Sequence, residues 1–325
     1  MTEPIFNNRL ELKELNEAVD QIKSEVGKVI VGQEQNLELL LVCLLCHGHA
    51  LLEGVPGVAK TLTAKLLSKT VNGTFTRLQF TPDLMPSDIL GTSVFNPKTL
   101  EFEYKPGPVF CNLILIDEIN RSPAKTQAAL FELMEERQVT IDGKTYFMPD
   151  PFVVIATQNP VEHEGTYRLP EAQLDRFFMK IQVGYPSHSE ELDLLRRFNT
   201  HLPADLSGTV NPVISTERLA RLRGLVHQVM LEDHLLKFIA SLIQASRNHK
   251  MIELGASPRA SLALMNAAKA MAAISGRDFV IPEDIKAVVL PVLRHRIVLT
   301  PEAEMEGVTE EEVLNGLLSG IEIPR

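Results

Sequence analysis

The sequence predicts an α/β protein whose five-stranded parallel sheet, flanked by helices, is followed by an all-helical lid. Short apolar runs alternate with helical patterns as far as residue 186, and a glycine-containing loop joins one such run to a helix. Beyond residue 212 the pattern is helical throughout. We therefore expect an α/β core at 1–186, a linker region at 187–212 and a helical lid domain at 213–325, which suits a chain of 325 residues.

In the core, runs of β-branched residues and leucine predict the strands, with helical patterns before and between them. The strands are expected at 50–53, 75–80, 112–117, 152–157 and 178–183, and helices at 9–29, 33–48 and 125–136. Two short insertions, 92–104 and 139–148, are predicted to be hairpins, and Asp142-Gly143 is a typical type I′ turn.

In the linker region and the lid, capping signals mark where helices begin. Ser187 with Glu190, and Thr309 with Glu312, match the capping box, while Ser257 followed by Pro258 is typical of an N-cap and first turn. The lid helices are expected at 215–230, 233–249, 258–275, 282–296 and 309–319.

The loop after the first strand has the composition of a phosphate-binding loop. Glycines at 54 and 57 allow backbone N–H groups to converge on phosphate oxygens, and the helix that follows directs its positive end at the same anion. Lys60 is placed to reach the β- and γ-phosphates, and Thr61 to bind Mg²⁺. Ala59 stands where the G-x-x-x-x-G-K-[ST] pattern has its second glycine, and we expect Ala59 to have a negative φ. The predicted nucleotide-binding residues here are Gly54, Val55, Pro56, Gly57, Val58, Ala59, Lys60, Thr61 and Leu62.

Two further strands end in polar residues that could act on a bound triphosphate. Asp117 and Glu118 close the 112–117 strand, at the carboxyl edge where open α/β sheets bind ligands. Asp117 is suited to hold Mg²⁺ and Glu118 to polarise the attacking water. Asn159 follows the 152–157 strand and could orient that water or contact the γ-phosphate.

These motifs, in their order and spacing, resemble those of the AAA+ ATPases and, among them, the MoxR family. The resemblance spans roughly residues 20 to 300. It is carried by Val31-Gly32-Gln33-Glu34, the 53–61 loop, Asp117-Glu118-Ile119-Asn120-Arg121, Ala156-Thr157-Gln158-Asn159-Pro160, Leu174-Asp175-Arg176-Phe177 and Ser257-Pro258-Arg259-Ala260.

The resemblance implies a role for each motif. The 54–61 loop would be Walker A, Asp117 and Glu118 Walker B, and Asn159 sensor 1, while Val31 and Gly32 would lie near the adenine. Arg176 would be an arginine finger that completes a neighbouring subunit's site, with Arg121 and Arg168 as rival candidates. Arg259 would be sensor 2, through which lid and core clamp ATP.

The implied function is Mg²⁺-dependent hydrolysis of ATP by a homo-oligomeric ring, expected to be a hexamer, that remodels or matures partner proteins. A von Willebrand A domain protein is the partner that the resemblance suggests. Two alternatives stay open: the ATPase motor of a magnesium-chelatase-like complex, and a nucleotide-gated assembly platform in which turnover is incidental.

Composition restricts the remaining classes. The net charge of −10 argues against a nucleic-acid-binding surface, because such surfaces are basic. The longest apolar run, 39–46, is too short to span a bilayer, and the first residues lack the pattern of a signal peptide, so we expect a cytoplasmic protein. Cys43-Leu44-Leu45-Cys46-His47 matches a haem-attachment pattern, but its apolar context predicts buried thiols instead.

Overall fold

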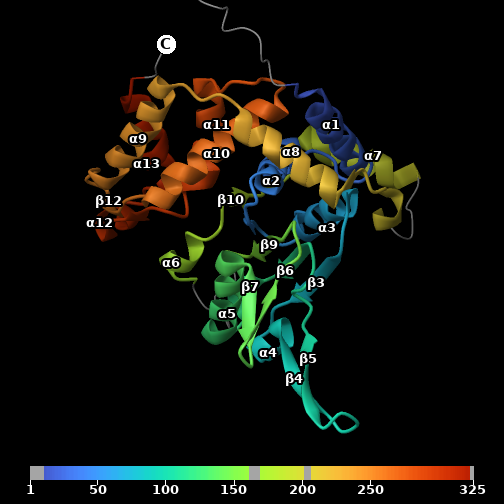
Figure 1. Ribbon diagram of the computed structural model, residues 1–325. Helices are drawn as coiled ribbons and strands as arrows, with labels where there is room; N and C mark the ends of the chain where they lie inside the picture. The colour runs from blue at the N-terminus through green and yellow to red at the C-terminus, as the bar shows by residue number, and fades with distance from the viewer. Residues whose placement is uncertain (1–10, 161–168, 201–205, 323–325) are drawn as a thin grey trace, which may run out of the picture.

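The five predicted strands form one parallel sheet, which confirms the α/β core. The structure is a computed structural model that describes residues 11–160, 169–200 and 206–322. The strand order is β10-β1-β9-β6-β3 (Figure 1). Their bounds are β1 Ala50–Glu53, β3 Phe75–Gln79, β6 Leu113–Asp117, β9 Val153–Gln158 and β10 Met179–Gln182.

Alternating side chains along the strands divide the interior into two hydrophobic layers. In β6, Leu113 and Leu115 face one layer while Ile114 and Ile116 face the other. Because neighbouring side chains of a strand point to opposite faces, apolar residues at every position bury both faces of the sheet. One layer holds α1 Lys13–Gly27, α2 Glu34–Leu45 and α3 Lys60–Thr70, and the other holds α4 Pro86–Leu90 and α5 Ala124–Glu136.

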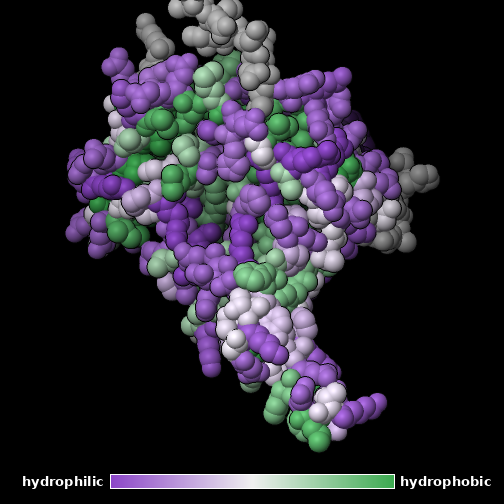
Figure 2. All heavy atoms as spheres, viewed as in Figure 1, coloured by the Kyte–Doolittle hydropathy of each residue, from purple (hydrophilic) through white to green (hydrophobic). Residues whose placement is uncertain are grey.

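Both predicted hairpins are present. The first, β4 Gly91–Asn96 with β5 Glu101–Pro106, extends away from the body and carries apolar side chains near its tip (Figures 1 and 2). The second is β7 Gln138–Ile141 with β8 Lys144–Phe147. Its turn residues Asp142 and Gly143 have φ values of 51° and 75°, the positive pair that a type I′ turn requires.

Outside the sheet and the two hairpins, the described residues are mainly helical, as predicted for the lid. Ser187 and Glu190 form the expected capping contacts before α7 (His188–Thr200), and the Thr309–Glu312 capping box precedes α13 (Glu310–Gly320). Ser257 is the N-cap residue of α10 (Pro258–Ile274), but its hydroxyl donates to Asp175 Oδ2 at 3.1 Å instead of capping the helix.

The helices of this part are α6 Glu171–Leu174, α7 His188–Thr200, η2 Leu206–Thr209, α8 Thr216–Gln228, α9 Asp233–Arg247, α10 Pro258–Ile274, α11 Pro282–Leu293, α12 Pro301–Met305 and α13 Glu310–Gly320. Three short pairing strands, β11 Ile214–Ser215, β12 Ile252–Leu254 and β13 Val298–Leu299, complete this part, with β11 pairing β2 Val71–Asn72 of the core.

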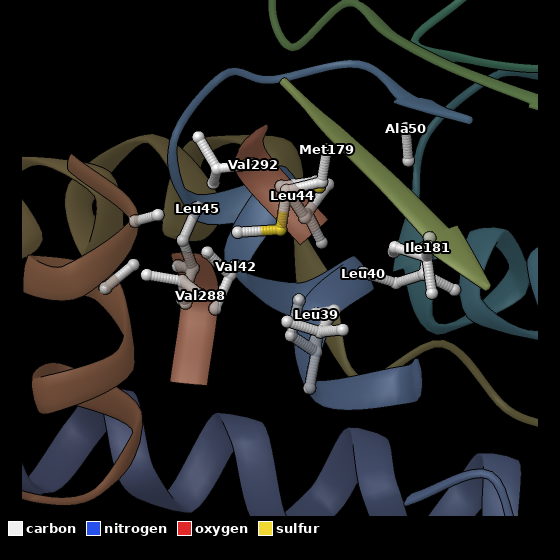
Figure 3. Close-up of a cluster of buried hydrophobic side chains, with 14 of the residues drawn as sticks. Leu39, Leu40, Val42, Leu44, Leu45, Ala50, Met179, Ile181, Val288 and Val292 are labelled. Atoms are coloured by element: carbon white, nitrogen blue, oxygen red, sulfur yellow. The ribbon is translucent and has the colours of Figure 1, made fainter. Parts of the chain in front are cut away.

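The helical lid and the sheet share one hydrophobic core. Leu44 and Leu45 of α2 lie between Met179 of β10 and the α11 residues Val288 and Val292 (Figure 3). All five are buried. The lid therefore packs onto the core through α2 and β10. Burial of this kind stabilises the fold by roughly 1.5–3 kcal/mol for each large apolar side chain.

No helix in the described ranges combines the length and the apolar character needed to cross a membrane.

The Cys-x-x-Cys-His segment at the end of α2 is part of the packed interior. Cys43 is buried, and burial raises the pKa of the Cys46 thiol to about 12, which makes the thiolate inaccessible at neutral pH. His47 Nδ1 accepts a hydrogen bond from the buried Arg223 at 2.9 Å. His49 lies between the carbonyl of Met134 (3.1 Å) and the amide of Val154, which donates to its Nδ1 at 2.9 Å.

The buried His49 predicts acid sensitivity. Burial lowers its pKa from the ordinary 6.5 to about 4, so between these values the unfolded chain binds more protons than the folded one. The free energy of unfolding should therefore fall as the pH falls, by about 2 kcal/mol from this residue between pH 7 and pH 5. Urea unfolding of wild type and His49→Gln at both pH values measures this contribution. An equal pH dependence in the two proteins would contradict it.

Candidate active site

The phosphate-binding loop leads from β1 into α3, and two glycines permit its course. A Cβ on Gly54 would lie 2.3 Å from the Val183 carbonyl oxygen, so the loop can leave the sheet only with glycine there. Gly57 has a φ of +86°, which favours glycine. Lys60, the first residue of α3, donates to the Gly54 carbonyl and, at 3.2 Å, to the Gln158 carbonyl, so its ammonium group lies between the loop and the end of β9.

The expectation for Ala59 was wrong: its φ is +59°, in the left-handed region. This conformation turns the Ala59 carbonyl into α3, where it accepts the Thr63 amide at 2.9 Å and the Thr63 hydroxyl at 3.0 Å. A left-handed alanine costs roughly 1–2 kcal/mol, which the contacts at the start of α3 offset. The Gln33 side-chain amide also holds the loop, because it donates a hydrogen bond to the Val58 carbonyl at 2.9 Å.

Thr61, near the start of α3, contacts Asp117, at the end of β6. The Thr61 hydroxyl donates to Asp117 Oδ1 at 2.7 Å, and Arg77 Nε contacts Asp117 Oδ2 at 2.7 Å. Asp117 is buried at the end of β6, and Thr157 of β9 donates to the same Oδ1 at 3.3 Å. A carboxylate and a hydroxyl are oxygen ligands of the kind that Mg²⁺ prefers, so the pair fits a magnesium ion that also contacts phosphate.

Glu118 adopts a left-handed backbone, with a φ of 58°, and its carboxylate points towards β3. Glu118 Oε2 accepts Gln79 Nε2 at 2.7 Å and lies 3.0 Å from Arg121 Nε. The two donors on one oxygen hold the Glu118 side chain in place.

The strand ends enclose a cavity of about 540 Å³. Most of the predicted site lies on its walls, including the buried Asn159. The lining residues are Pro56, Gly57, Val58, Ala59, Lys60, Thr61, Leu62, Lys65, Arg77, Gln79, Asp117, Glu118, Thr157, Gln158 and Asn159. Gly54 and Val55 are outside this lining, and Gly54 takes part through its carbonyl contact with Lys60.

Val31 and Gly32 line a second cavity, of about 310 Å³, together with the buried apolar side chains Val26 and Leu37. Gln33 is also in its lining and bonds to the phosphate-binding loop. This arrangement places a partly apolar pocket beside the polar cavity.

Arg176 and Arg259 lie elsewhere. Neither is among the described residues that line the 540 Å³ cavity. Both contact Glu135 near the end of α5, Arg176 Nη2 at 3.0 Å and Arg259 Nη2 at 2.5 Å. In the view of Figure 1, α6, which precedes Arg176, and α3 are on opposite sides of the sheet. Of the rival arginines, Arg121 contacts Glu118, and Arg168 lies outside the described residues.

Comparison with known proteins decides the family. Residues 49–179 match the ATPase family associated with various cellular activities (AAA), and residues 244–317 match the AAA lid domain. Chaperone MoxR1 of Mycobacterium tuberculosis is 46% identical over 310 residues, covering 93% of this chain and 81% of that protein. The chain belongs to the MoxR family of AAA+ ATPases.

Two further proteins are similar to this chain along nearly its whole length. The uncharacterised YeaC protein of Bacillus subtilis is 46% identical over 312 residues, covering 96% of this chain and 97% of YeaC. The crystal structure of a proposed ATPase from Cytophaga hutchinsonii has a TM-score of 0.88 and 45% identity, covering 97% of this chain and 98% of that one.

Sequence reasoning missed Arg77 and Gln79, which contact Asp117 and Glu118 respectively. Both lie on β3, whose residue Gln79 is in register with Asp117. Alternate residues of a strand share a face, so the two side chains could have been found by pairing β3 with β6. Glu135 carried no comparable signal, because it belongs to an ordinary charged run at the end of a helix.

Replacing Ala59 with glycine should stabilise the protein. Glycine removes the cost of the left-handed conformation and adds some flexibility to the unfolded chain, so the free energy of unfolding should rise by about 0.5–1 kcal/mol. Urea unfolding of wild type and Ala59→Gly measures the difference. A lower stability of the glycine variant would show that the left-handed alanine is not strained.

Proposed function

We propose that this chain binds Mg²⁺-ATP in the 540 Å³ cavity and hydrolyses it to ADP and phosphate. The observation that carries the proposal is that three features line one cavity. They are the loop that carries Lys60, the acidic pair Asp117 and Glu118 at the end of β6, and Asn159 after β9. Lys60 would hold the β- and γ-phosphates, Glu118 would polarise the attacking water, and Asn159 would orient that water.

Thr61 and Asp117 would hold magnesium, which neutralises charge on the phosphates when bound. Their 2.7 Å contact, with the Asp117 carboxylate buried, supports this assignment. Arg77 contacts the second carboxylate oxygen and lies on the wall of the cavity, where it adds positive charge. The second cavity, at Val31 and Gly32, would receive the adenine, since its apolar wall suits a flat base.

We further propose that Arg176 acts on the ATP of a neighbouring copy, and that Arg259 does the same instead of clamping the ATP of its own chain. Support comes from their position on Glu135, away from the cavity of their own chain. A site that requires arginines from the next subunit works only in an assembly, and a closed ring gives every subunit such a neighbour. A hexamer is the ring size that we propose.

The work done by this ring would be the remodelling or maturation of partner proteins, in accord with the name of the chaperone relative. The apolar tip of the β4–β5 hairpin, with Phe95 and Phe102 exposed and in edge-to-face contact, is a candidate surface for a client. A von Willebrand A domain protein in the cytoplasm is the partner class that we propose to test first.

Glu118→Gln tests the proposed reaction. The variant should bind Mg²⁺-ATP with nearly unchanged affinity, because an amide preserves the shape of the side chain, and turnover should fall by about 10²–10⁴-fold with the loss of general-base catalysis. Calorimetry gives the binding constant and phosphate release gives the rate. Turnover at the wild-type rate would exclude Glu118 from the reaction. A variant that traps ATP yet keeps its cellular function would favour an assembly platform over a motor.

Arg176→Ala tests the contribution from a neighbour. ATP affinity should be retained while turnover falls by about 10³-fold or more, as when an arginine finger is lost. In a mixture with Glu118→Gln, some interfaces combine an intact Glu118 site with an intact Arg176, so part of the activity should return. Full activity of Arg176→Ala alone would contradict the assignment.

A further inference from the structure

Two arginines from different parts of the fold converge on Glu135. Glu135 is in the last turn of the core helix α5, Arg176 follows the short helix α6, and Arg259 is in the first turn of the lid helix α10. Glu135 Oε2 is 3.0 Å from Arg176 Nη2, and Glu135 Oε1 is 2.5 Å from Arg259 Nη2. One carboxylate therefore uses both of its oxygens to hold two guanidinium groups side by side.

The carboxylate makes this arrangement stable. Two guanidinium groups that contact the same carboxylate would repel one another without it, and the anion between them adds two attractions. A tetrahedral phosphate oxyanion offers the same opportunity with more charge and more acceptor oxygens. Glu135 thus occupies, within one protomer, the position relative to the two arginines that a phosphate from elsewhere could take.

The contact is accessible and exchangeable. The side chains of Glu135, Arg176 and Arg259 are 36%, 29% and 49% exposed. Ion pairs that are open to solvent contribute little to stability, so a more highly charged anion can replace the carboxylate at small cost.

The neighbouring carboxylate, Asp175, behaves differently. Its Oδ1 accepts Arg296 Nε at 2.7 Å, and the Arg296 side chain is only 2% exposed. Arg296 also donates to the carbonyls of Phe177 and Phe178, at 2.6 and 3.0 Å. This buried network fixes the backbone on both sides of Arg176 to the lid. Asp175 is anchored by Arg296, and its Oδ2 also lies 3.9 Å from Arg259 Nη1, whereas Glu135 contacts only the ends of the two arginine side chains.

We propose that Glu135 is a positioning residue: it holds Arg176 and Arg259 as a pair within one protomer and gives up both to a phosphate group carried by a second copy of this chain. The inference rests on the proposed function, because it requires a phosphate at the interface between copies. Its consequence is specific. The charge of Glu135 opposes nucleotide-dependent association, since the contacts with Glu135 must be broken before the arginines reach the phosphate.

The test is the protein concentration at which half of the chain is assembled, measured by sedimentation velocity with Mg²⁺ and a non-hydrolysable ATP analogue. Glu135→Gln should assemble at about three- to tenfold lower concentration than wild type, the equivalent of two exposed ion pairs. Glu136→Gln is the matched control, because it removes the same charge from the adjacent exposed residue of α5. This control should assemble like wild type.

Two further measurements separate a phosphate-linked effect from a general effect of surface charge. Without nucleotide, Glu135→Gln and wild type should behave alike. In the double variant Glu135→Gln, Arg176→Ala, most of the gain should disappear. An unchanged or higher half-assembly concentration of Glu135→Gln with the analogue would overturn the proposal, as would an equal gain without nucleotide or in Glu136→Gln.

The outcomes also distinguish this inference from the proposed function. If wild type neither assembles with the analogue nor hydrolyses ATP at any concentration, the proposed function fails. If wild type does both, and Arg176→Ala lowers turnover as expected while Glu135→Gln has no effect on assembly, only the role of Glu135 is wrong.

Discussion

The contact between Thr61 and Asp117 is the interaction on which the rest of the site depends. It joins the start of α3 to the end of β6, which are 56 positions apart in the chain, at a distance of 2.7 Å. The parallel register makes it possible: β1 pairs β9 and β9 pairs β6, so that all three strands end at one edge. A slip of one residue in β6 would turn Asp117 to the other face of the sheet, and the carboxylate would leave the cavity.

The lid is connected to this edge through packing and through charge. Its helices share the hydrophobic core with α2 and β10, and its residue Arg296 binds Asp175 beside Arg176. Because the Arg296 side chain is only 2% exposed, removing Asp175 would leave an unpaired charge in the interior, which is strongly destabilising. The segment that carries Arg176 and the lid that carries Arg259 are therefore held together, so a movement of the lid would carry both arginines.

Much of the fold and of the cavity was predictable from the sequence, because periodicity and turn chemistry act locally. The strand 112–117 needed only its apolar run, and Asp142-Gly143 needed only its turn preference. The prediction for Ala59 was wrong because its φ depends on the hydrogen bonds between the Ala59 carbonyl and Thr63. The conformational preference of alanine alone does not predict those bonds. The shared partner of Arg176 and Arg259 was also beyond reach, since Glu135 lies 41 positions before one and 124 before the other in sequence. Only tertiary packing, within the core for Arg176 and of lid on core for Arg259, brings the three side chains together.

The most direct measurement of the central claim is the binding of Mg²⁺-ATP to Lys60→Ala by isothermal titration calorimetry. If the loop between β1 and α3 holds the phosphates at the edge where Thr61 meets Asp117, loss of the Lys60 ammonium group should abolish measurable binding while the fold, followed by circular dichroism, stays intact. Binding of wild-type strength by the folded variant would mean that the triphosphate is held elsewhere, and the account of this site would be wrong.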